Sequence, residues 1–316
     1  MPITPSTDKY AQLLARCEGL PPIPTAVAHP CDQSSLDGAL EAARLGLITP
    51  LLVGPEWRIR QVAEEHGLTL GDTPIIDTAH SHASAEAAVE AVRSGRAELL
   101  MKGSLHTDEL LHAVTRSTSG LRTERRLSHV FAMDVPTYHK PLFITDAAVN
   151  IFPTLNEKAD IVRNAIDLVR ILGVERPKVA ILSAVETVTD KIPSTIDAAA
   201  LCMMSLRGQI EGGLLDGPLA FDNAISKAAA ETKGIHSEVA GDPDILLVPD
   251  LEAGNMLAKQ LTFLAGAEAA GIVLGARVPI ILTSRADSVR ARIGSCAIAV
   301  LIAHARRVAS EAAVKV

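Results

Sequence analysis

Short apolar runs alternate with longer amphipathic or alanine-rich stretches along the whole chain. The short runs are bounded by turn-forming and polar residues, which predicts strands, and the longer stretches carry the spacing of helices. Such an alternation predicts an α/β protein in which mostly parallel sheets are covered by helices on both faces. We expect strands at residues 25–28, 50–53, 98–101, 127–133, 141–145, 179–182, 245–248 and 278–282. We expect helices at residues 36–45, 84–94, 107–115, 158–172, 195–209, 255–270 and 288–309.

The length of the chain predicts two domains. At about 100–200 residues per domain, 316 residues suit two α/β units. A new helical stretch begins just after Pro153, which places a boundary near residues 145–155. We expect a first domain of residues 1–147 plus 288–316 and a second domain of residues 148–287. The C-terminal helix returns to the first domain in this division because a strand that ends at Leu282 needs a helical crossover.

Composition narrows both the fold class and the range of partners. Hydrophobic residues make up 48% of the chain but aromatic residues only 3%, so the core consists mainly of Ala, Val, Leu and Ile. This favours helices packed on parallel strands over an all-β sandwich. It also argues against stacking platforms for single-stranded nucleic acid. The net charge of −7 gives no basic footprint, so we expect no nucleic-acid partner.

Cysteine usage and hydropathy favour a cytoplasmic protein. The four cysteines are widely separated and form no C-x-x-C pair, which predicts reduced thiols rather than disulfides or a zinc ribbon. The first twenty residues carry charges throughout and lack the apolar segment of a leader. The longest apolar stretch, residues 293–305, is shorter than the roughly 20 residues that span a bilayer. We expect it to form a buried helix and expect no membrane association.

Several familiar catalytic and binding motifs are absent from the sequence. No two of the 21 glycines stand two positions apart, so the G-x-G-x-x-G dinucleotide fingerprint does not occur. The Walker phosphate loop, the G-x-S-x-G nucleophile elbow and the H-E-x-x-H zinc motif are also missing. The ten histidines show no metal-ligand spacing, so we expect no metal site.

Polar and cationic residues gather just after the predicted strands, where ligands bind in parallel α/β sheets. An arginine, a hydroxyl group and backbone N–H groups at a helix N-terminus can form an anion site. Several of these residues also have an ordinary structural explanation. Ser284, Asp287, Ser288 and Asp250 could be helix N-caps, and Lys102 could be a surface lysine. The candidates are Lys102, Thr107, Arg125, Ser128, Asp250, Asn255, Ser284, Arg285 and Asp287.

Three sequence blocks carry a resemblance to a known enzyme family. The segment from Asp244 to Lys259 contains the pattern P-D-L-x-A-G-N-x-x-x-K, and residues 280–287 read I-I-L-T-S-R-A-D. Residues 216–222 match the block D-G-x-L-x-x-D. Together these blocks resemble the phosphate acetyl/butyryltransferases. Residues 101–107 and 127–131 are similar to the butyryl branch and to the transferase half of bifunctional enoyl-CoA hydratase/phosphate acetyltransferase proteins.

The resemblance implies a fold, a reaction and an assembly. The family has two α/β domains with a cleft between them, similar to isocitrate and isopropylmalate dehydrogenases, and is usually a homodimer. Its reaction converts acyl-CoA and phosphate to acyl phosphate and CoA by direct attack in a ternary complex. The acyl group is short, acetyl or butyryl. CoA and phosphate are substrates, and no metal or redox cofactor is implied.

The resemblance also implies roles for the candidate residues. Arg285 would bind phosphate, and Ser284 would donate a hydrogen bond to the developing oxyanion or to the sulfur. Acetyl-type members carry an aspartate seven residues after this serine as the base on CoA, but Ala291 stands at that position here. The nearest carboxylate, Asp287, is therefore our candidate base. Substrate contacts are expected from Ser128, Thr107, Lys102, Arg125, Asp250 and Asn255.

Two other functions fit the same residues. The first is a dehydrogenase of related fold acting on a phosphorylated hydroxy-substrate, which would need a metal site that the strand ends do not show. The second is a protein that binds acyl-CoA or acyl phosphate without catalysis. Ala291 favours this second alternative, whereas the retained Ser284–Arg285 pair favours the enzyme.

Overall fold

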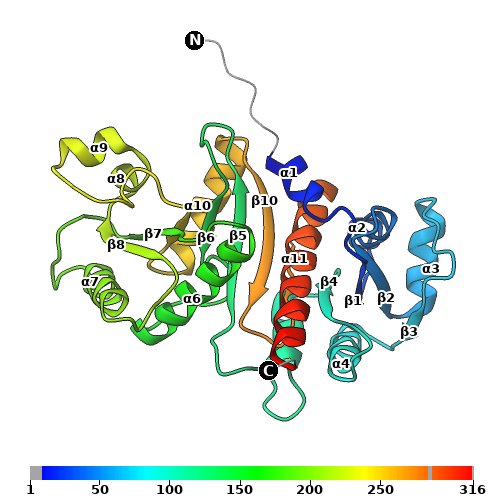
Figure 1. The fold of residues 1–316 in the computed structure, drawn as a ribbon. Coiled ribbons are helices and arrows are strands. Elements are labelled where there is room, and N and C mark those ends of the chain that lie inside the picture. The colour runs from blue at the N-terminus through cyan, green and yellow to red at the C-terminus, as the bar shows by residue number, and fades with distance from the viewer. Residues whose placement is uncertain (1–8, 284–286, 315–316) are drawn as a thin grey trace. The chain divides into compact units, whose positions relative to one another are not determined.

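The computed structural model describes residues 9–283 and 287–314, which divide into two compact units (Figure 1). Unit 1 contains Lys9 and Arg126–Ala269, and unit 2 contains Tyr10–Arg125 and the described residues from 270 onward. Both divisions lie N-terminal to the expected boundaries at 147/148 and 287/288. The first does so because residues 128–145 form an antiparallel pair within the sheet of unit 1. The C-terminal helix belongs with the N-terminal third of the chain, in unit 2.

The sheet of unit 2 is parallel except at one strand. Its order is β3-β2-β1-β4-β11-β10, and only β10 runs antiparallel to its neighbour β11. The strand core is almost entirely aliphatic, as the composition predicts. The bounds are β1 Ile23–Ala28, β2 Ile48–Gly54, β3 Ile75–Asp77, β4 Leu99–Lys102, β10 Glu268–Leu274 and β11 Ile280–Ile281.

The helices of unit 2 form two packed groups. Helices α2 (Gln33–Arg44) and α3 (Glu56–Glu65) contact each other, and α11 (Val289–Val314) packs on α2 and β11. Helix α4 (Ser81–Arg93) packs on β1, β2 and β4 and on α5 (Thr107–Thr115). Right-handed crossovers explain this grouping, because the chain steps in one direction through β1, β2 and β3 and then reverses to reach β4. A short helix, α1 (Lys9–Ala15), precedes the sheet.

Helix α11 is the long apolar helix that the sequence predicts. By length and composition, Val289–Ala312 would suffice to cross a membrane, but most of it is buried within the protein. Every residue from 292 to 303 is buried, so the expectation of a buried helix at 293–305 is confirmed over most of its length. Packing on α2 and β11 accounts for the apolar character of this helix.

The sheet of unit 1 has five strands in the order β5-β6-β9-β7-β8. Strands β6, β9, β7 and β8 are parallel, and β5 pairs antiparallel with β6. The bounds are β5 Ser128–Asp134, β6 Leu142–Thr145, β7 Lys178–Leu182, β8 Leu214–Leu219 and β9 Ile245–Leu247. The helices are α6 Leu155–Ile171, α7 Pro193–Leu206, α8 Phe221–Ile225, α9 Lys227–Thr232 and α10 Leu251–Leu264.

Helices cover both faces of the unit 1 sheet. Ile144, Ala180 and Leu246 pack in one cluster with Ala258 of α10. Side chains alternate between the two faces along a strand, so the neighbours of these strand residues, such as Phe143, face the opposite side of the sheet. On that side, α6 contacts β5, β6 and β9. Burial on both faces explains why the central strands are continuous apolar runs rather than alternating patterns.

Strands β3, β8 and β10 and the end of α10 differ from the expectation. The predicted helix at 255–270 is in fact α10, which ends at Leu264, followed by β10. The prediction extended the helix too far because Glu268-Ala269-Ala270, at the start of β10, has a composition typical of helices. Strand β8 contains Gly217-Pro218, a pair that is depleted in strands and hides it from pattern reading. Strand β3 has only three residues and no fully buried one.

An ion cluster lies beside the strands of unit 1. The Asp242 carboxylate accepts from Lys178 Nζ at 2.6 Å and pairs with Lys140 Nζ at 3.0 Å. Burial alone would raise the pKa of Asp242, but the hydrogen bonds and charges of these two lysines outweigh it and lower the pKa to about 2. The ionised carboxylate therefore stabilises the fold above the ordinary pKa of an aspartate, and this contribution is lost as the pH falls toward 2.

We expect Asp242→Asn to lower the free energy of unfolding at pH 7 by about 1 kcal/mol, a value reduced for solvent screening because the side chain is partly exposed. Between pH 4 and pH 2 the variant should lose less stability than the parent. Urea unfolding at several pH values measures both effects. The exposed Asp190→Asn is the control, and parallel pH curves for the parent and Asp242→Asn would contradict the prediction.

Candidate functional site

The carboxyl ends of β1, β4 and β11 meet at one edge of the unit 2 sheet. The register places Ala28 beside Lys102, and Ile281 beside Met101. Just beyond β4 the chain crosses so closely to β1 that a Cβ atom on Gly103 would lie 2.5 Å from the backbone oxygens of Ala28 and His29. Only glycine fits there, so this residue fixes the loop that leads from Lys102 to α5.

Two predicted residues, Lys102 and Thr107, lie on this edge. The Lys102 side chain is buried, and its Nζ donates to the backbone oxygen of Gly103 at 3.3 Å. The alternative of a surface lysine is therefore wrong. Thr107 is half-buried at the first position of α5, where the cap residue His106 makes no side-chain cap bond.

The structure shows which residue caps the N-terminus of α11. Ser288 Oγ accepts from the Ala291 backbone N–H at 3.1 Å, so Ser288 occupies the capping role. Asp287, one residue earlier, is half-buried, and its negative charge partly opposes the lowering that burial imposes on the pKa of Arg292. Ser284 and Arg285 lie outside the described residues.

Sequence reasoning missed Arg292 as a buried charged residue that reaches the end of β11. It is a nearly fully buried charged side chain, 2% exposed, at the end of the first turn of α11. Its Nη1 donates to Thr283 Oγ1 at 2.7 Å, and its Nη2 donates to Ser34 Oγ at 3.2 Å. In the sequence, Arg292 stands directly before a long apolar run. An arginine at such a position is normally expected on the helix surface, so nothing in the sequence indicated that this one is buried.

Arg125 is not brought to this edge of unit 2. The preceding residues Arg122 and Thr123 contact the turn between β10 and β11, through a bridge to Ala276 and a 2.6 Å bond to the Gly275 oxygen. That turn lies at the amino end of β11, opposite to Lys102 and Thr107 in the sheet. The Arg125 side chain is exposed, and its role in binding CoA stays a prediction.

A second group of polar residues lies at the edge of the unit 1 sheet, where β6 ends and β5 begins. The buried Asp146 carboxylate accepts four N–H groups. Oδ1 binds the backbone N–H groups of Ala148 and Val149, both at 2.9 Å. Oδ2 binds the His129 backbone N–H at 3.1 Å and Asn150 Nδ2 at 2.6 Å. This one carboxylate therefore fixes the loop that follows β6 and joins it to the start of β5.

Three predicted residues surround this loop. Ser128 is fully buried, and its hydroxyl accepts from Asn164 Nδ2 at 2.8 Å. Asn255 is half-buried and donates to the Ala147 oxygen at 3.3 Å. Asp250 caps α10 by accepting from the Ala253 backbone N–H at 2.9 Å, so the capping interpretation of Asp250 is confirmed. The structure thus brings Ser128, Asp250 and Asn255 to one edge.

Gly254 explains part of the P-D-L-x-A-G-N pattern physically. A Cβ atom at this position would lie 2.7 Å from Val248 Cγ2 and 2.9 Å from the Asp146 backbone oxygen. The glycine lets the first turn of α10 pack directly on the loop that Asp146 holds. The side chain of Asn255, the next residue, reaches the same loop as a result.

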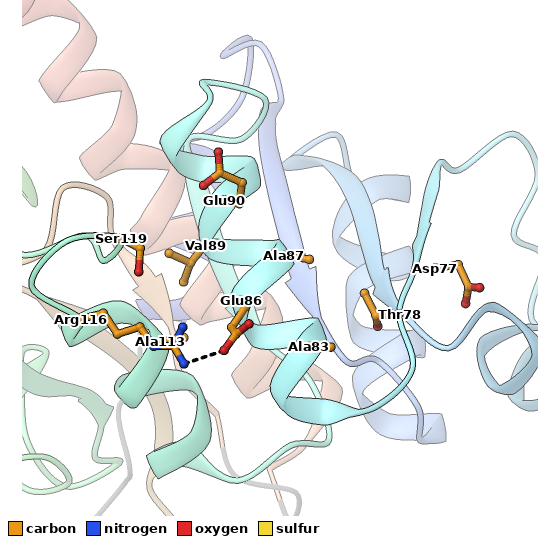
Figure 2. A pocket seen from close by; sticks show the side chains of 10 residues that line it. All are labelled: Asp77, Thr78, Ala83, Glu86, Ala87, Val89, Glu90, Ala113, Arg116 and Ser119. Atoms are coloured by element: carbon orange, nitrogen blue, oxygen red, sulfur yellow. Dashed lines mark ion pairs between the residues drawn. The ribbon is translucent and has the colours of Figure 1, made fainter.

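A separate pocket in unit 2 lies between α4 and α5 and contains none of the predicted residues (Figure 2). Its volume is about 540 Å³, and Asp77, Glu86 and Glu90 make part of its wall acidic. Arg116 on the opposite wall pairs with Glu86 at 2.6 Å, so its charge is compensated. The pocket therefore does not have the character of a phosphate site.

The described residues show neither a cluster suited to a metal ion nor an activated thiol. Within residues 9–283 and 287–314, no group of three or more His, Cys, Asp or Glu side chains is arranged to hold a metal ion. All four cysteines are free. Burial raises the pKa of Cys296 to about 12, and burial together with the charge of Asp216 raises that of Cys202 to about 12, so neither thiol is activated as a nucleophile.

Comparison with known proteins gives one consistent family. The family model described as phosphate acetyl/butaryl transferase matches residues 79–300. A phosphate acetyltransferase of Rhizobium meliloti is 66% identical over 313 residues, covering 99% of this chain and 98% of the relative. A phosphate butyryltransferase of Clostridium acetobutylicum is 41% identical over 278 residues, covering 88% of this chain and 92% of the relative.

Solved structures agree with the sequence matches. A branched-chain phosphotransacylase from Enterococcus faecalis superposes with a TM-score of 0.78 at 30% identity, covering 89% of this chain and 99% of that chain. A 4-hydroxythreonine-4-phosphate dehydrogenase from Klebsiella pneumoniae, at 10% identity and a TM-score of 0.54, covers 89% of this chain and 99% of that chain. This second match shows the fold alone and confirms the expected likeness to dehydrogenases. By the extent and identity of these matches, the chain belongs to the phosphate acetyl/butyryltransferase family.

Proposed function

We propose that this enzyme transfers a short acyl group reversibly between CoA and inorganic phosphate. The observation that supports this most is a 66% identity to a phosphate acetyltransferase over almost the whole chain. The Ser284–Arg285 pair follows Thr283 in the sequence, and both of its residues lie outside the described part of the chain. The acyl group is acetyl or butyryl, since relatives of both names match over most of the chain.

The reaction needs a bound phosphate, a stabilised oxyanion and the transfer of one proton. A phosphate oxygen attacks the thioester carbonyl, the C–S bond breaks, and the proton lost by phosphate is taken up by the departing CoA thiolate. We assign Arg285 to phosphate binding, because a guanidinium binds phosphate oxygens bidentately, and Ser284 to the oxyanion or the sulfur. Asp287 is the proposed proton carrier, and direct attack in a ternary complex requires no covalent enzyme intermediate.

Six further residues are proposed to contact the substrates. On the unit 2 edge, the buried Lys102 and the α5 residue Thr107 suit an anion, and Arg125 suits the CoA phosphates. On the unit 1 edge, Ser128 and Asn255 suit the phosphate or the acyl carbonyl. Asp250, which caps α10 through one carboxylate oxygen, is proposed to contact the substrates beside Asn255.

Thiol release from acetyl-, propionyl- and butyryl-CoA, with and without phosphate, tests the proposal. CoA release that depends on phosphate supports the transferase, and the chain length with the highest kcat/KM identifies the acyl group. Binding of acyl-CoA without any release would favour the non-catalytic alternative, to which Ala291 points. Reduction of NAD with a phosphorylated hydroxy-substrate would favour the dehydrogenase alternative instead.

We further propose a cytoplasmic homodimer that uses CoA and phosphate only as substrates, without a metal or redox cofactor. Neither nucleic acid nor membrane is expected as a partner, given the net charge of −7 and the burial of α11. Light scattering of the purified enzyme measures its mass against the 33.3 kDa of one chain. Unchanged CoA release after treatment with a chelator supports the absence of a metal.

Asp287→Asn should lower kcat by roughly 10²-fold if the carboxylate carries the proton. The substitution keeps the shape of the side chain, so the KM for acyl-CoA should stay within about threefold. The exposed Asp72→Asn in the same unit is the control. A pH–rate profile of Asp287→Asn that overlays the parent profile would assign Asp287 a structural role, with the phosphate passing its proton directly.

A further inference from the structure

His29, the first residue after β1, has an unusual backbone conformation. Its φ is 57°, and among the described residues other than glycine it alone has a positive φ. Successive carbonyl groups of an extended strand point to opposite sides. Here the oxygens of Ala28 and His29 both accept from the loop after β4, from the N–H groups of Gly103 at 2.8 Å and Ser104 at 2.9 Å. The left-handed backbone of His29 therefore turns its carbonyl group toward this loop.

The imidazole ring of His29 is bound to the first turn of α4. Its Nδ1 lies 2.9 Å from Ser84 Oγ, which also lies 2.8 Å from Thr78 Oγ1 and 3.0 Å from the His80 backbone oxygen. A hydroxyl group donates one proton and accepts at two lone pairs. Because a carbonyl can only accept, all three bonds form only when Ser84 donates to His80 and accepts from both Thr78 and His29. The Nδ1 atom of His29 therefore carries the proton.

The ring is an anchor of fixed protonation. Burial, helped by the charge of His80, lowers the pKa of His29 more than the charges of Glu109 and Asp32 raise it, so the ring is neutral at pH 7. Ser84 is fully buried, and removing the ring would leave its hydroxyl with an unsatisfied lone pair. The bond to α4 thus holds His29 in a conformation that a residue with a Cβ atom otherwise disfavours.

One peptide unit connects His29 to the buried Lys102. The N–H group of Ser104 and its hydroxyl both donate to the His29 oxygen, each at 2.9 Å. The carbonyl group of the same peptide belongs to Gly103, and its oxygen accepts from Lys102 Nζ at 3.3 Å. The N–H and C=O groups of a trans peptide point in opposite directions, so a rotation that breaks one bond also moves the other partner. The carbonyl group of His29 therefore determines where the Lys102 ammonium is held.

We propose that His29 is a positioning residue that, through the peptide between Gly103 and Ser104, holds the Lys102 ammonium where it binds a phosphate group of a substrate. This proposal rests on the proposed function, in which Lys102 contacts an anion at the edge of unit 2. The phosphate group belongs either to inorganic phosphate or to CoA. His29 itself does not touch the substrates in this role. A displacement of about 1 Å can lower a rate by about 10²-fold, so the anchor has kinetic consequences.

Two substitutions of His29 separate the donor at Nδ1 from the rest of the ring. Asparagine adopts left-handed conformations and carries an amide N–H as many bonds from Cα as Nδ1, so His29→Asn should keep kcat/KM within about threefold of the parent. Glutamine places its amide one bond farther away, so His29→Gln should lose roughly 10- to 100-fold. A higher KM for phosphate would identify inorganic phosphate as the ligand of Lys102, and a higher KM for acyl-CoA would identify CoA. A loss in His29→Asn as large as in His29→Gln, or unchanged KM values in His29→Gln, would overturn the proposal.

A double-mutant cycle tests whether His29 acts through Lys102. In the Lys102→Ala background, adding His29→Gln should change kcat/KM by less than about twofold, because the group that His29 positions is already gone. Losses that multiply independently would overturn the proposal. The exposed His66→Gln in the same unit is the matched control, and it should keep parent values in both backgrounds. A merely structural loss lowers the folded fraction, and hence the apparent kcat, without changing either KM.

A measurement without turnover separates failure of this proposal from failure of the proposed function. Amide hydrogen exchange of a peptide covering residues 103–107 should be at least about threefold faster in His29→Gln than in the parent, His29→Asn and His66→Gln. If the parent shows no phosphate-dependent CoA release, the proposed function has failed, and faster exchange would still support the anchoring of this loop by His29. Equal exchange in all four proteins would overturn the anchor regardless of activity.

Discussion

Arg285→Ala should lower kcat/KM by roughly 10²- to 10³-fold, the effect expected when a charge-stabilising donor is removed from the reacting centre. The loss should appear mainly as a higher KM for phosphate together with a lower kcat. A guanidinium holds the phosphate oxygens in fork geometry and offsets the charge that develops on them during attack. Initial rates of CoA release over a range of phosphate concentrations measure both parameters.

Two further variants make this test specific to the guanidinium. Arg285→Lys keeps the charge but not the fork, so it should retain intermediate activity. Free guanidinium ion added to Arg285→Ala should restore part of the rate but should not affect the parent. Arg93→Ala is the control, since Arg93 forms an exposed pair with Glu90 at 3.0 Å. A kcat/KM near that of the parent in Arg285→Ala would assign phosphate binding to other residues.

The fold could be predicted from the sequence where strands are buried on both faces. Strands such as β1 and β9 are short aliphatic runs between helices, and their burial leaves a pattern that reads directly as α/β. Pattern reading failed at β8, where Gly217-Pro218 interrupts the run, and at β10, whose alanines continue the composition of α10. In both places neighbouring strands in the sheet, and not local preference, determine the conformation.

The site was predictable only as a set of residue types after strand ends. Strand order decides which of these residues meet, and this order cannot be derived from local pattern. It brings Ser128, Asp250 and Asn255 around the loop after β6, and it sends the Arg122–Arg125 segment to the opposite edge from Lys102. Arg292 and Asp146 were missed because their importance lies in partners distant in the sequence, such as Ser34 and His129.

Asp146→Asn should lower the free energy of unfolding by about 3 kcal/mol, although it changes only one oxygen to nitrogen. Both carboxylate oxygens of Asp146 accept two N–H groups each. An asparagine can keep one such pair, but its NH₂ group then faces two donors on the other side. Two buried hydrogen bonds are lost, and N–H groups are forced against each other. Urea denaturation of the parent and the variant at pH 7 measures the difference.

The comparison with Asp77→Asn shows whether the loss of stability in Asp146→Asn comes from the four hydrogen bonds that the Asp146 carboxylate accepts or from the loss of its charge alone. Among the described residues, Asp77 Oδ1 accepts one N–H group, that of the Glu56 backbone at 2.8 Å, in an exposed position, so the same substitution there should change stability by under about 1 kcal/mol. Because the Asp146 loop also contacts Asn255, Asp146→Asn should lower CoA release more than its folded fraction accounts for. If Asp146→Asn were as mild as Asp77→Asn, the loop after β6 would be held by its packing against Gly254 rather than by the carboxylate.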